Sequence, residues 1–324
     1  PAGEIVGAMD ATFTIENVML EDAGEYYVMV YGECGEVMSD IVTLTVTPWT
    51  QCIDLLAAVN GASTYLDLIE DDIATIFAEV ALLNAVEFYT PSRVYVPGGS
   101  TFSWDEARGA KVSLLEGGWP TELCVEGYPT LGFDLAIPAG WSLMPVWAYD
   151  AVNAGDIFNQ LGDKLEIAFS MDYSGVWWPL YGIETLELLV PGSAYLVKLN
   201  EAGTVSWDVP PADAVAASYV PYPANLTSWN NVTMTGVQHT IAITAAALEG
   251  LQLGDVIGAF NQYGATAGLV EVTHLKQNIA LRVYGDNLAT QETDGFIDGD
   301  VMTFNVYRDG EIIEVAATFD NNLP

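Results

Sequence analysis

The residues best suited to metal chemistry lie in one acidic stretch near the C-terminus. Between Asp286 and Asp300 the sequence is DNLATQETDGFIDGD, with carboxylates at Glu292, Asp294, Asp298 and Asp300 around two glycines. Calcium is bound by clustered oxygen ligands, and turns of this kind can direct several carboxylates to one point. The sequence therefore predicts a calcium site, and calcium is the one cofactor that it suggests. Because the stretch lacks the full EF-hand pattern, an ordinary solvated turn is the alternative that we favour.

A second candidate site is aromatic. The segment VWWPLYG contains Trp177, Trp178 and Tyr181, which predict a platform on which sugar rings can stack. The alternative is that these side chains belong to a core and a hairpin. We favour that alternative, because aromatic clusters in domains with short strands mostly pack internally.

Catalytic motifs are missing from the sequence. We find no nucleophile elbow, zinc-protease, P-loop or dinucleotide-binding pattern. Glycoside hydrolysis needs only two suitably placed carboxylates, but nothing singles out a pair among the 44 acidic residues. We therefore expect that the protein is not an enzyme.

The cysteine pattern allows at most one internal disulfide. The three cysteines are Cys34, Cys52 and Cys124, and they show none of the spacings typical of zinc ligands. Cys52 and Cys124 lie near the two ends of one candidate unit, so a bridge between them would tie those ends together. We expect this pair, with Cys34 free or paired between chains.

The charge balance excludes several kinds of partner. The chain has 44 acidic and 8 basic residues and a formal charge of −36. Such a chain repels phosphate backbones and anionic lipid surfaces, so we expect no nucleic-acid partner. No apolar run reaches the roughly 18 residues of a membrane-spanning helix, so we expect no membrane span in this segment. The acidic surface fits a solvated coat, which we favour, or a surface that collects divalent cations.

The elements that must position these residues predict a mostly β protein made of tandem small domains. We expect a partial β-sandwich over 1–48, two α+β units over 49–128 and 129–212, and a C-terminal β-sandwich over 213–324. Strand-like runs alternate with turn signals throughout the last unit. There the pair Asp309-Gly310 predicts a β-hairpin.

The two central units are a tandem duplication. The segment 53–77 can be laid over 133–158, and the landmarks Phe77 with Phe158, Pro97 with Pro179 and Gly109 with Gly192 keep similar separations. Each copy predicts a strand, a short helix and two or three further strands. In the first copy, Asp71 or Asp72 can cap a helix whose apolar face contains Ile73, Ile76, Phe77 and Val80.

The opening stretch resembles a known domain family. Asp22, Gly24 and Tyr26 match the D-x-G-x-Y-x-C motif of immunoglobulin-like domains, in which the tyrosine hydroxyl bonds back to the backbone. Val28 stands where the core cysteine would be, as in many bacterial members. The resemblance covers about the first 48 residues and implies only the closing half of a sandwich. We expect that the missing strands lie upstream in a longer protein or are supplied by a neighbouring subunit.

The second copy resembles repeats of secreted and cell-surface proteins of Bacteroidetes-type bacteria, of the kind exported as type IX secretion cargo. The matching residues are Pro138, Ala139, Gly140, Trp141, Ser142, Trp178, Pro179, Tyr181, Gly182, Gly192 and Lys198. Gly254, Asp255, Gly258 and Phe260 resemble the first landmark of a module found near the ends of the same proteins. The resemblance implies secretion and surface display, and no reaction.

Together these observations favour a structural or adhesive segment of a secreted bacterial surface protein. One version is a subunit of an extracellular fibre that exchanges strands with its neighbours. The expected partners are copies of the chain, neighbouring domains of a longer chain, or glycans. The alternative is a calcium-aided carbohydrate-binding or stalk module of a secreted hydrolase.

Overall fold

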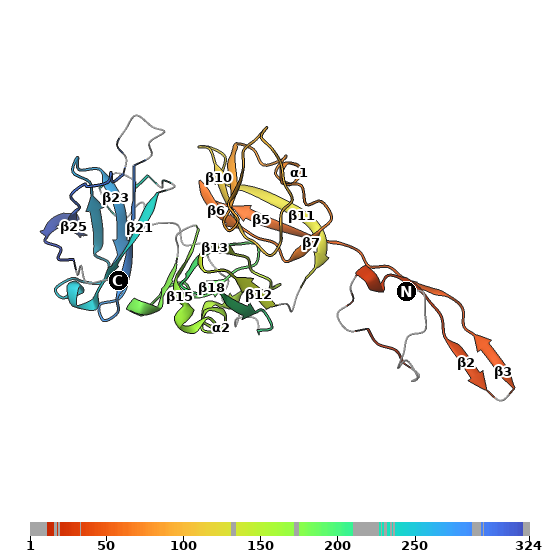
Figure 1. Ribbon diagram of the computed structural model, residues 1–324. Coiled ribbons are helices and arrows are strands. Elements are labelled where there is room, and N and C mark those ends of the chain that lie inside the picture. Colours follow the sequence, from red (N-terminus) through yellow and green to blue (C-terminus); the bar gives the residue numbers. More distant parts are fainter. Residues whose placement is uncertain are drawn as a thin grey trace.

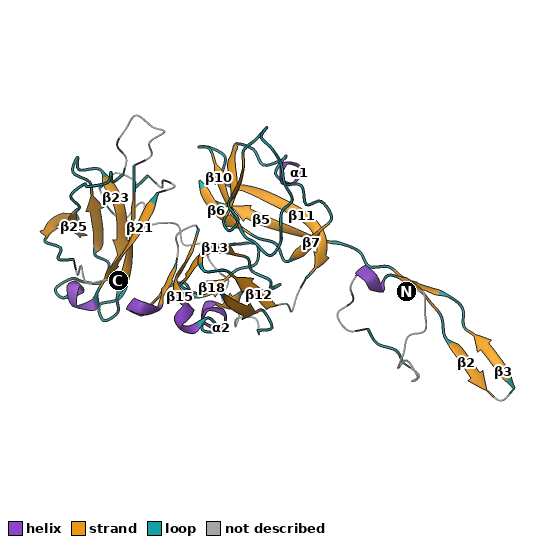
Figure 2. Cartoon of the chain, in the orientation of Figure 1, coloured by secondary structure: helices purple, strands orange, loops and turns teal. Residues whose placement is uncertain are grey.

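The chain forms an extended arm and three β-rich bodies that follow one another in sequence order (Figure 1). The computed structural model describes residues 12–319 apart from 16, 17, 19, 33, 131–133, 172–174, 210–226, 228, 230, 231, 234, 236, 287–292 and 294. Strands dominate the described residues, and the helices are short (Figure 2). The predicted fold class, mostly β with tandem small domains, is confirmed.

The N-terminal arm, residues 20–46, is a long two-stranded hairpin. It contains the 3₁₀ helix η1 (Leu20–Asp22) and strands β1 (Gly24–Tyr26), β2 (Met29–Gly32), β3 (Gly35–Met38) and β4 (Val42–Leu44). β1 pairs with β4 and β2 pairs with β3, both antiparallel. The hydroxyl of Tyr26 donates a hydrogen bond to the carbonyl oxygen of Asp22 at 2.5 Å. This is the local contact expected of a tyrosine corner.

The first repeat contains two antiparallel sheets around one core. Its elements are β5 (Trp49–Leu55), β6 (Val59–Ala62), β7 (Leu66–Leu68), α1 (Ile73–Ile76), β8 (Leu83–Phe88), β9 (Arg93–Tyr95), β10 (Ala110–Leu114) and β11 (Thr121–Pro129). The strand orders are β6-β10-β8-β9 and β5-β11-β7. Alternate residues of β5, Gln51, Ile53 and Leu55, are buried, as expected for a strand with one face on the core. β11 extends one residue past the predicted limit of this unit.

Helix α1 begins where the sequence predicts it. The side chain of Asp72 accepts a hydrogen bond from the backbone N–H of Thr75 at 3.0 Å, so Asp72 rather than Asp71 is the N-cap. Ile73 and Phe77 are buried on the apolar face that follows. The pKa of Asp72 lies below its ordinary value, chiefly because the hydroxyl of Thr101 donates to the ionised carboxylate.

The second repeat is larger. Its elements are β12 (Asp134–Ile137), β13 (Gly140–Met144), β14 (Val152–Asn153), α2 (Ala154–Phe158), η2 (Gly162–Lys164), β15 (Leu165–Ser170), β16 (Val176–Trp178), η3 (Pro179–Tyr181), β17 (Ile183–Glu184), β18 (Leu188–Leu189), β19 (Tyr195–Leu199) and β20 (Gly203–Ser206). Its main sheet has the order β13-β19-β15-β16-β17, with β12-β20 and β14-β18 as separate pairs.

The two repeats share one topology. The order β6-β10-β8-β9 corresponds to β13-β19-β15-β16, and the pair β5-β11 corresponds to β12-β20. The helices begin at equivalent points, since Asp72 bridges to Ser103 and Asn153 pairs with Leu188. Such agreement in strand order and pairing supports the tandem duplication inferred from sequence.

Strand register refines the alignment of the repeats. The ladder between β10 and β8 and the ladder between β19 and β15 each contain one register shift, next to Leu83 and Leu165 respectively. Leu114 pairs with Leu83 at the first shift, and Leu199 pairs with Leu165 at the second. Counting back five residues from Leu114 and from Leu199 therefore makes Ala194 the counterpart of Gly109. The expected partner, Gly192, therefore lies two residues away from the true counterpart, because the turn before β19 differs in length from the turn before β10.

The seam between the repeats has approximate two-fold symmetry. A Cβ atom built on Gly109 would lie 2.4 Å from the Cβ atom of its counterpart Ala194, so the two positions face each other. Gly61 and its counterpart Leu143 make reciprocal contacts. A Cβ atom on Gly61 would lie 2.2 Å from the carbonyl oxygen of Ala194, and Gly109 donates its N–H to the carbonyl oxygen of Leu143 at 2.9 Å. Reciprocal contacts of this kind define a two-fold interface.

The C-terminal unit consists of two sheets with apolar residues between them. Its elements are β21 (Gln238–Ile243), η4 (Ala245–Leu248), β22 (Val256–Phe260), β23 (Thr266–Glu271), β24 (Ile279–Tyr284), β25 (Thr303–Arg308) and β26 (Glu311–Val315). β21 pairs with β24, and the other sheet has the order β23-β22-β25-β26. Asp309 and Gly310, both at positive φ, connect β25 to β26. The predicted hairpin at this position is confirmed.

An ion pair between a buried carboxylate and a partly exposed guanidinium joins the start of β22 to the end of β25. The Arg308 guanidinium donates from Nε and Nη2 to the two carboxylate oxygens of Asp255, at 2.7 and 2.5 Å. The side chain of Asp255 is only 2% exposed, and that of Arg308 is 25% exposed. The Arg308 hydrogen bonds hold the pKa of Asp255 below its ordinary value. The resulting stability is present above the unfolded pKa of aspartate and is lost as the pH falls through the folded value.

Replacing Arg308 with alanine should lower the free energy of unfolding of the C-terminal unit at neutral pH. The reason is that the carboxylate of Asp255 stays buried without its cation. The loss should shrink in acid, where Asp255 is protonated in both proteins. Hydrogen exchange of the β22 and β25 amides at several pH values measures this loss of stability, with Arg308→Lys as the charge-conserving control. A loss that does not change with pH would contradict this role.

Candidate functional site

The N-terminal arm exposes apolar side chains on both of its faces. Val30 and Val37 are directly opposite each other on β2 and β3 and are 62% and 71% exposed. Successive residues of a strand point to opposite faces, so Tyr31 and Met38, also exposed, lie on the other side. A hairpin with water on both sides usually has polar residues on at least one of them. The pattern on this arm is instead that of strands that are covered by other parts of a fold.

The arm also lacks a core of its own. None of the described residues before Gln51 is buried. An isolated two-stranded hairpin is marginally stable in water, and each of its strands has an outer edge of unpaired N–H and C=O groups. Figure 1 shows β2 and β3 projecting away from the three bodies. These backbone edges and apolar faces are the features of the arm that can bind another strand.

The charge on this part of the chain is of one sign. The first basic residue is Arg93, whereas the sequence of the arm contains six acidic residues: Glu21, Asp22, Glu25, Glu33, Glu36 and Asp40. Like charges on two arms repel each other through water, and salt screens that repulsion. Any contact between arms therefore depends on apolar burial and backbone pairing, and we expect it to strengthen with ionic strength.

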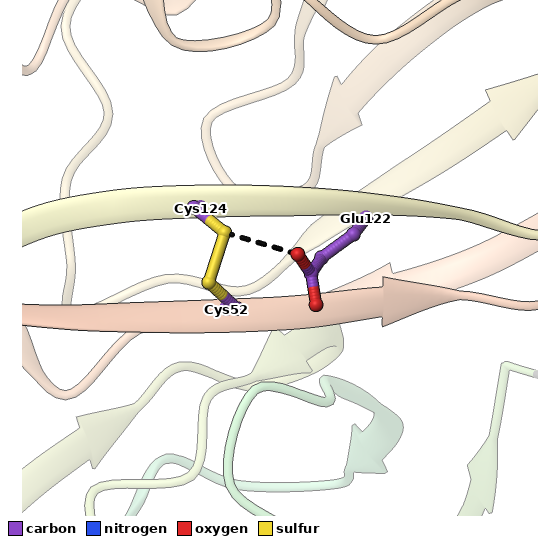
Figure 3. Close-up of side chains that lie close together, drawn as sticks. All are labelled: Cys52, Glu122 and Cys124. Carbon is purple, nitrogen blue, oxygen red and sulfur yellow. Dashed lines mark hydrogen bonds between the residues drawn. A yellow bond between two sulfur atoms is a disulfide. The ribbon is translucent and has the colours of Figure 1, made fainter.

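Cys52 and Cys124 form the expected disulfide (Figure 3). They are directly opposite on β5 and β11, with Cα atoms 4.0 Å apart. Oε2 of Glu122 lies 3.4 Å from Sγ of Cys124 on the same exposed face. Because a disulfide sulfur is no longer a thiolate, this group does not offer the ligands of a zinc site while it is oxidised. Cys34, near the tip of the arm, is free and exposed.

The structure describes only half of the expected calcium site. Glu292 and Asp294 lie outside the described residues. Asp298 is exposed, and the carboxylate of Asp300 accepts hydrogen bonds from the backbone N–H of Ile297 at 3.0 Å and from the Gln262 amide at 2.5 Å. The described part of the stretch thus shows a turn stabilised by Asp300, and the calcium site stays a prediction.

The three rings of the expected glycan platform do not share an exposed face. Trp177 is buried in the core of the second repeat, 5.7 Å from the ring of Phe158. Trp178 points to the opposite side of β16, where its ring makes a T-shaped contact with the ring of Tyr181, with 4.5 Å between the ring centroids. The carbonyl oxygen of Tyr181 accepts a hydrogen bond from Asn278 of the C-terminal unit at 2.6 Å. These rings therefore pack within the second repeat and beside the C-terminal unit.

A different group of aromatic rings could not be predicted from the sequence. Trp49, Tyr65 and Tyr149 meet at the seam of the two repeats. They are separated by up to a hundred residues in sequence, so no local spacing connects them. The only local signal is Trp49 itself, a large apolar side chain directly after Pro48, where the character of the sequence changes.

An open groove of about 610 Å³ lies elsewhere on this seam. Arg108 and Lys164, two of the eight basic residues, lie along it, and none of the described residues that line it is a carboxylic acid. A glycosidase site requires two facing carboxylates. The groove does not present that arrangement.

Two further findings bear on the class of protein. Within the described residues, no helix has both the length and the apolar character needed to cross a membrane. The chain matches no protein-family model, and neither a curated protein nor a solved structure gave a match.

Proposed function

We propose that the chain is a non-enzymatic structural or adhesive segment of a secreted bacterial surface protein, and that its N-terminal arm pairs with strands of a neighbouring copy. The observation that carries the proposal is the arm: two strands with apolar residues on both faces, free backbone edges and no buried residue among those described. Pairing at a strand edge is a common mode of recognition between chains.

Other features support an extracellular setting. A disulfide such as Cys52–Cys124 persists in oxidising compartments and is rare in the cytosol. Strong acidity keeps a surface protein solvated. The resemblance to immunoglobulin-like domains and to Bacteroidetes-type surface repeats suggests the same location.

Cys34 allows a direct test, because it is free and the other two cysteines are bonded to each other. An environment-sensitive fluorophore on Cys34 should report a less polar surrounding as protein concentration rises, since pairing buries the tip of the arm. The shift should grow with added salt, which screens the repulsion between acidic arms. Unlabelled Cys34→Ser protein, followed by sedimentation, controls for effects of the label. A signal that is independent of both concentration and salt would count against the proposal.

A further inference from the structure

The ring cluster, Trp49, Tyr65 and Tyr149, joins the two repeats at their surface. Trp49 begins β5, Tyr65 precedes β7, and Tyr149 lies in the loop after β13. The rings of Trp49 and Tyr149 are 5.1 Å apart between centroids and tilted by 30°, and Tyr65 meets Tyr149 edge-on at 5.3 Å. Because the rings come from both repeats, the cluster exists only when the repeats are docked.

Two rings of the cluster are far more exposed than the rings of the cores. Trp49 is 48% exposed and Tyr149 is 44% exposed, whereas core rings such as Phe77 and Phe158 are almost fully buried. Within the described part of the chain, neither the indole N–H of Trp49 nor the hydroxyl of Tyr149 has a hydrogen-bond partner. Tyrosine and tryptophan with one apolar side and one free polar group are typical of binding surfaces.

The loop that carries Tyr149 is held in place. The backbone N–H of Val146 donates to the Ser63 hydroxyl at 3.2 Å, and the indole N–H of Trp147 donates to the Glu106 carbonyl oxygen at 3.1 Å. Both acceptors belong to the first repeat, so these two hydrogen bonds fix the loop of the second repeat to the first. A preorganised ring loses little entropy when a ligand binds.

Two acidic residues lie close in sequence to rings of the cluster. Asp150 follows Tyr149, and its charge adds to burial in raising the pKa of Tyr65. Asp67 lies on β7, two residues after Tyr65. Carboxylates accept hydrogen bonds from hydroxyl groups, and they repel anions. The site therefore favours a ligand that has many hydroxyl groups, apolar C–H faces and no negative charge.

We propose that the ring cluster is a binding site for neutral carbohydrate. The C–H face of a pyranose is apolar and weakly positive, and it stacks on the negative face of an aromatic ring. The exposed surface of Trp49 and Tyr149 provides such faces, and the carboxylates of Asp67 and Asp150 can accept sugar hydroxyl hydrogen bonds. This proposal does not depend on pairing of the arm.

Affinity electrophoresis of the full chain tests the site, with gels that contain soluble cellulose ether, xylan, mannan or starch. The chain should be retarded by at least one of these neutral polysaccharides and not by polygalacturonate. Trp49→Ala and Tyr149→Ala should each weaken the retardation roughly tenfold. Tyr263→Ala, which removes a strongly exposed ring from the C-terminal unit, is the matched control and should change nothing. Unchanged thermal unfolding of the variants would show that they fold.

The proposal is overturned if no neutral polysaccharide retards the chain, or if Trp49→Ala and Tyr149→Ala bind as tightly as the control. Retardation by polygalacturonate alone would also overturn it. A variant with a polar arm should retain the binding, so failure of the carbohydrate site and failure of arm pairing can be told apart.

Discussion

Replacing Cys52 and Cys124 with serine should lower the free energy of unfolding of the first repeat by about 4 kcal/mol, because the bridge closes a long loop. The two cysteines are separated by 72 residues and enclose nearly the whole unit. Removing the cross-link restores conformational freedom to the unfolded chain. The native pairing of β5 with β11 does not need the bridge, since the ladder extends from Leu55 to Trp49. The variant should therefore fold, but open more often.

Hydrogen exchange of the β5 and β11 amides measures this loss locally, which matters because a chain of several units need not unfold in one step. Serine suits the exposed face that both residues share. Cys34→Ser, which removes the free cysteine, is the matched control and should leave exchange in the first repeat unchanged. A loss under about 1 kcal/mol would contradict the role given to the bridge.

Making one face of the arm polar should weaken self-association about a hundredfold. Val30→Glu combined with Val37→Lys places an ion pair at directly opposite positions, so the hairpin and the net charge are kept. The loss follows from the apolar contact of the two side chains, since burial of a valine contributes roughly 1.5–3 kcal/mol. A total of about 3 kcal/mol corresponds to about a hundredfold in the association constant.

Sedimentation over a wide range of protein concentrations measures the association. Val94→Glu combined with Val96→Lys is the matched control, because it alters two similarly exposed valines on the first repeat, outside the arm. The control should associate like the unmodified chain. If both variants associate equally well, the arm is not the contact.

Local patterns predicted much of the fold. The cap at Asp72, the hairpin at Asp309 and Gly310 and the tandem repeat all depend on residues close in sequence or on a constant spacing. The counterpart of Gly109 was placed wrongly, because residue spacing does not reveal which turn has gained residues. Strand register, which the structure supplies, corrects it to Ala194.

The candidate sites depend on contacts that spacing in the sequence does not determine. Trp177 and Trp178 are adjacent on a strand and therefore point to opposite faces, so a platform that uses both is excluded once the strand is recognised. Asp300 accepts a hydrogen bond from a backbone N–H of its own turn. Side chains of aspartate often bond to nearby backbone groups in this way, which is the alternative to binding a metal ion. The ring cluster arises from the docking of two repeats, and no sequence window contains all of it.

The approximate two-fold seam has a consequence for the proposed role. Gly61 and Gly109 allow the backbones of the two repeats to approach closely, and any larger side chain at Gly61 would collide with the backbone of Ala194. The repeats are therefore fitted to each other along this contact. Such a pair is suited to act as one rigid element behind a projecting arm.

Electron microscopy of the purified chain, compared with the Val30→Glu and Val37→Lys double variant, shows whether the arm drives assembly. We expect the unmodified chain to form oligomers or filaments in which the arm lies at each contact, and the double variant to yield separate particles. Separate particles for both proteins, at all concentrations and salt levels, would contradict assembly through the arm.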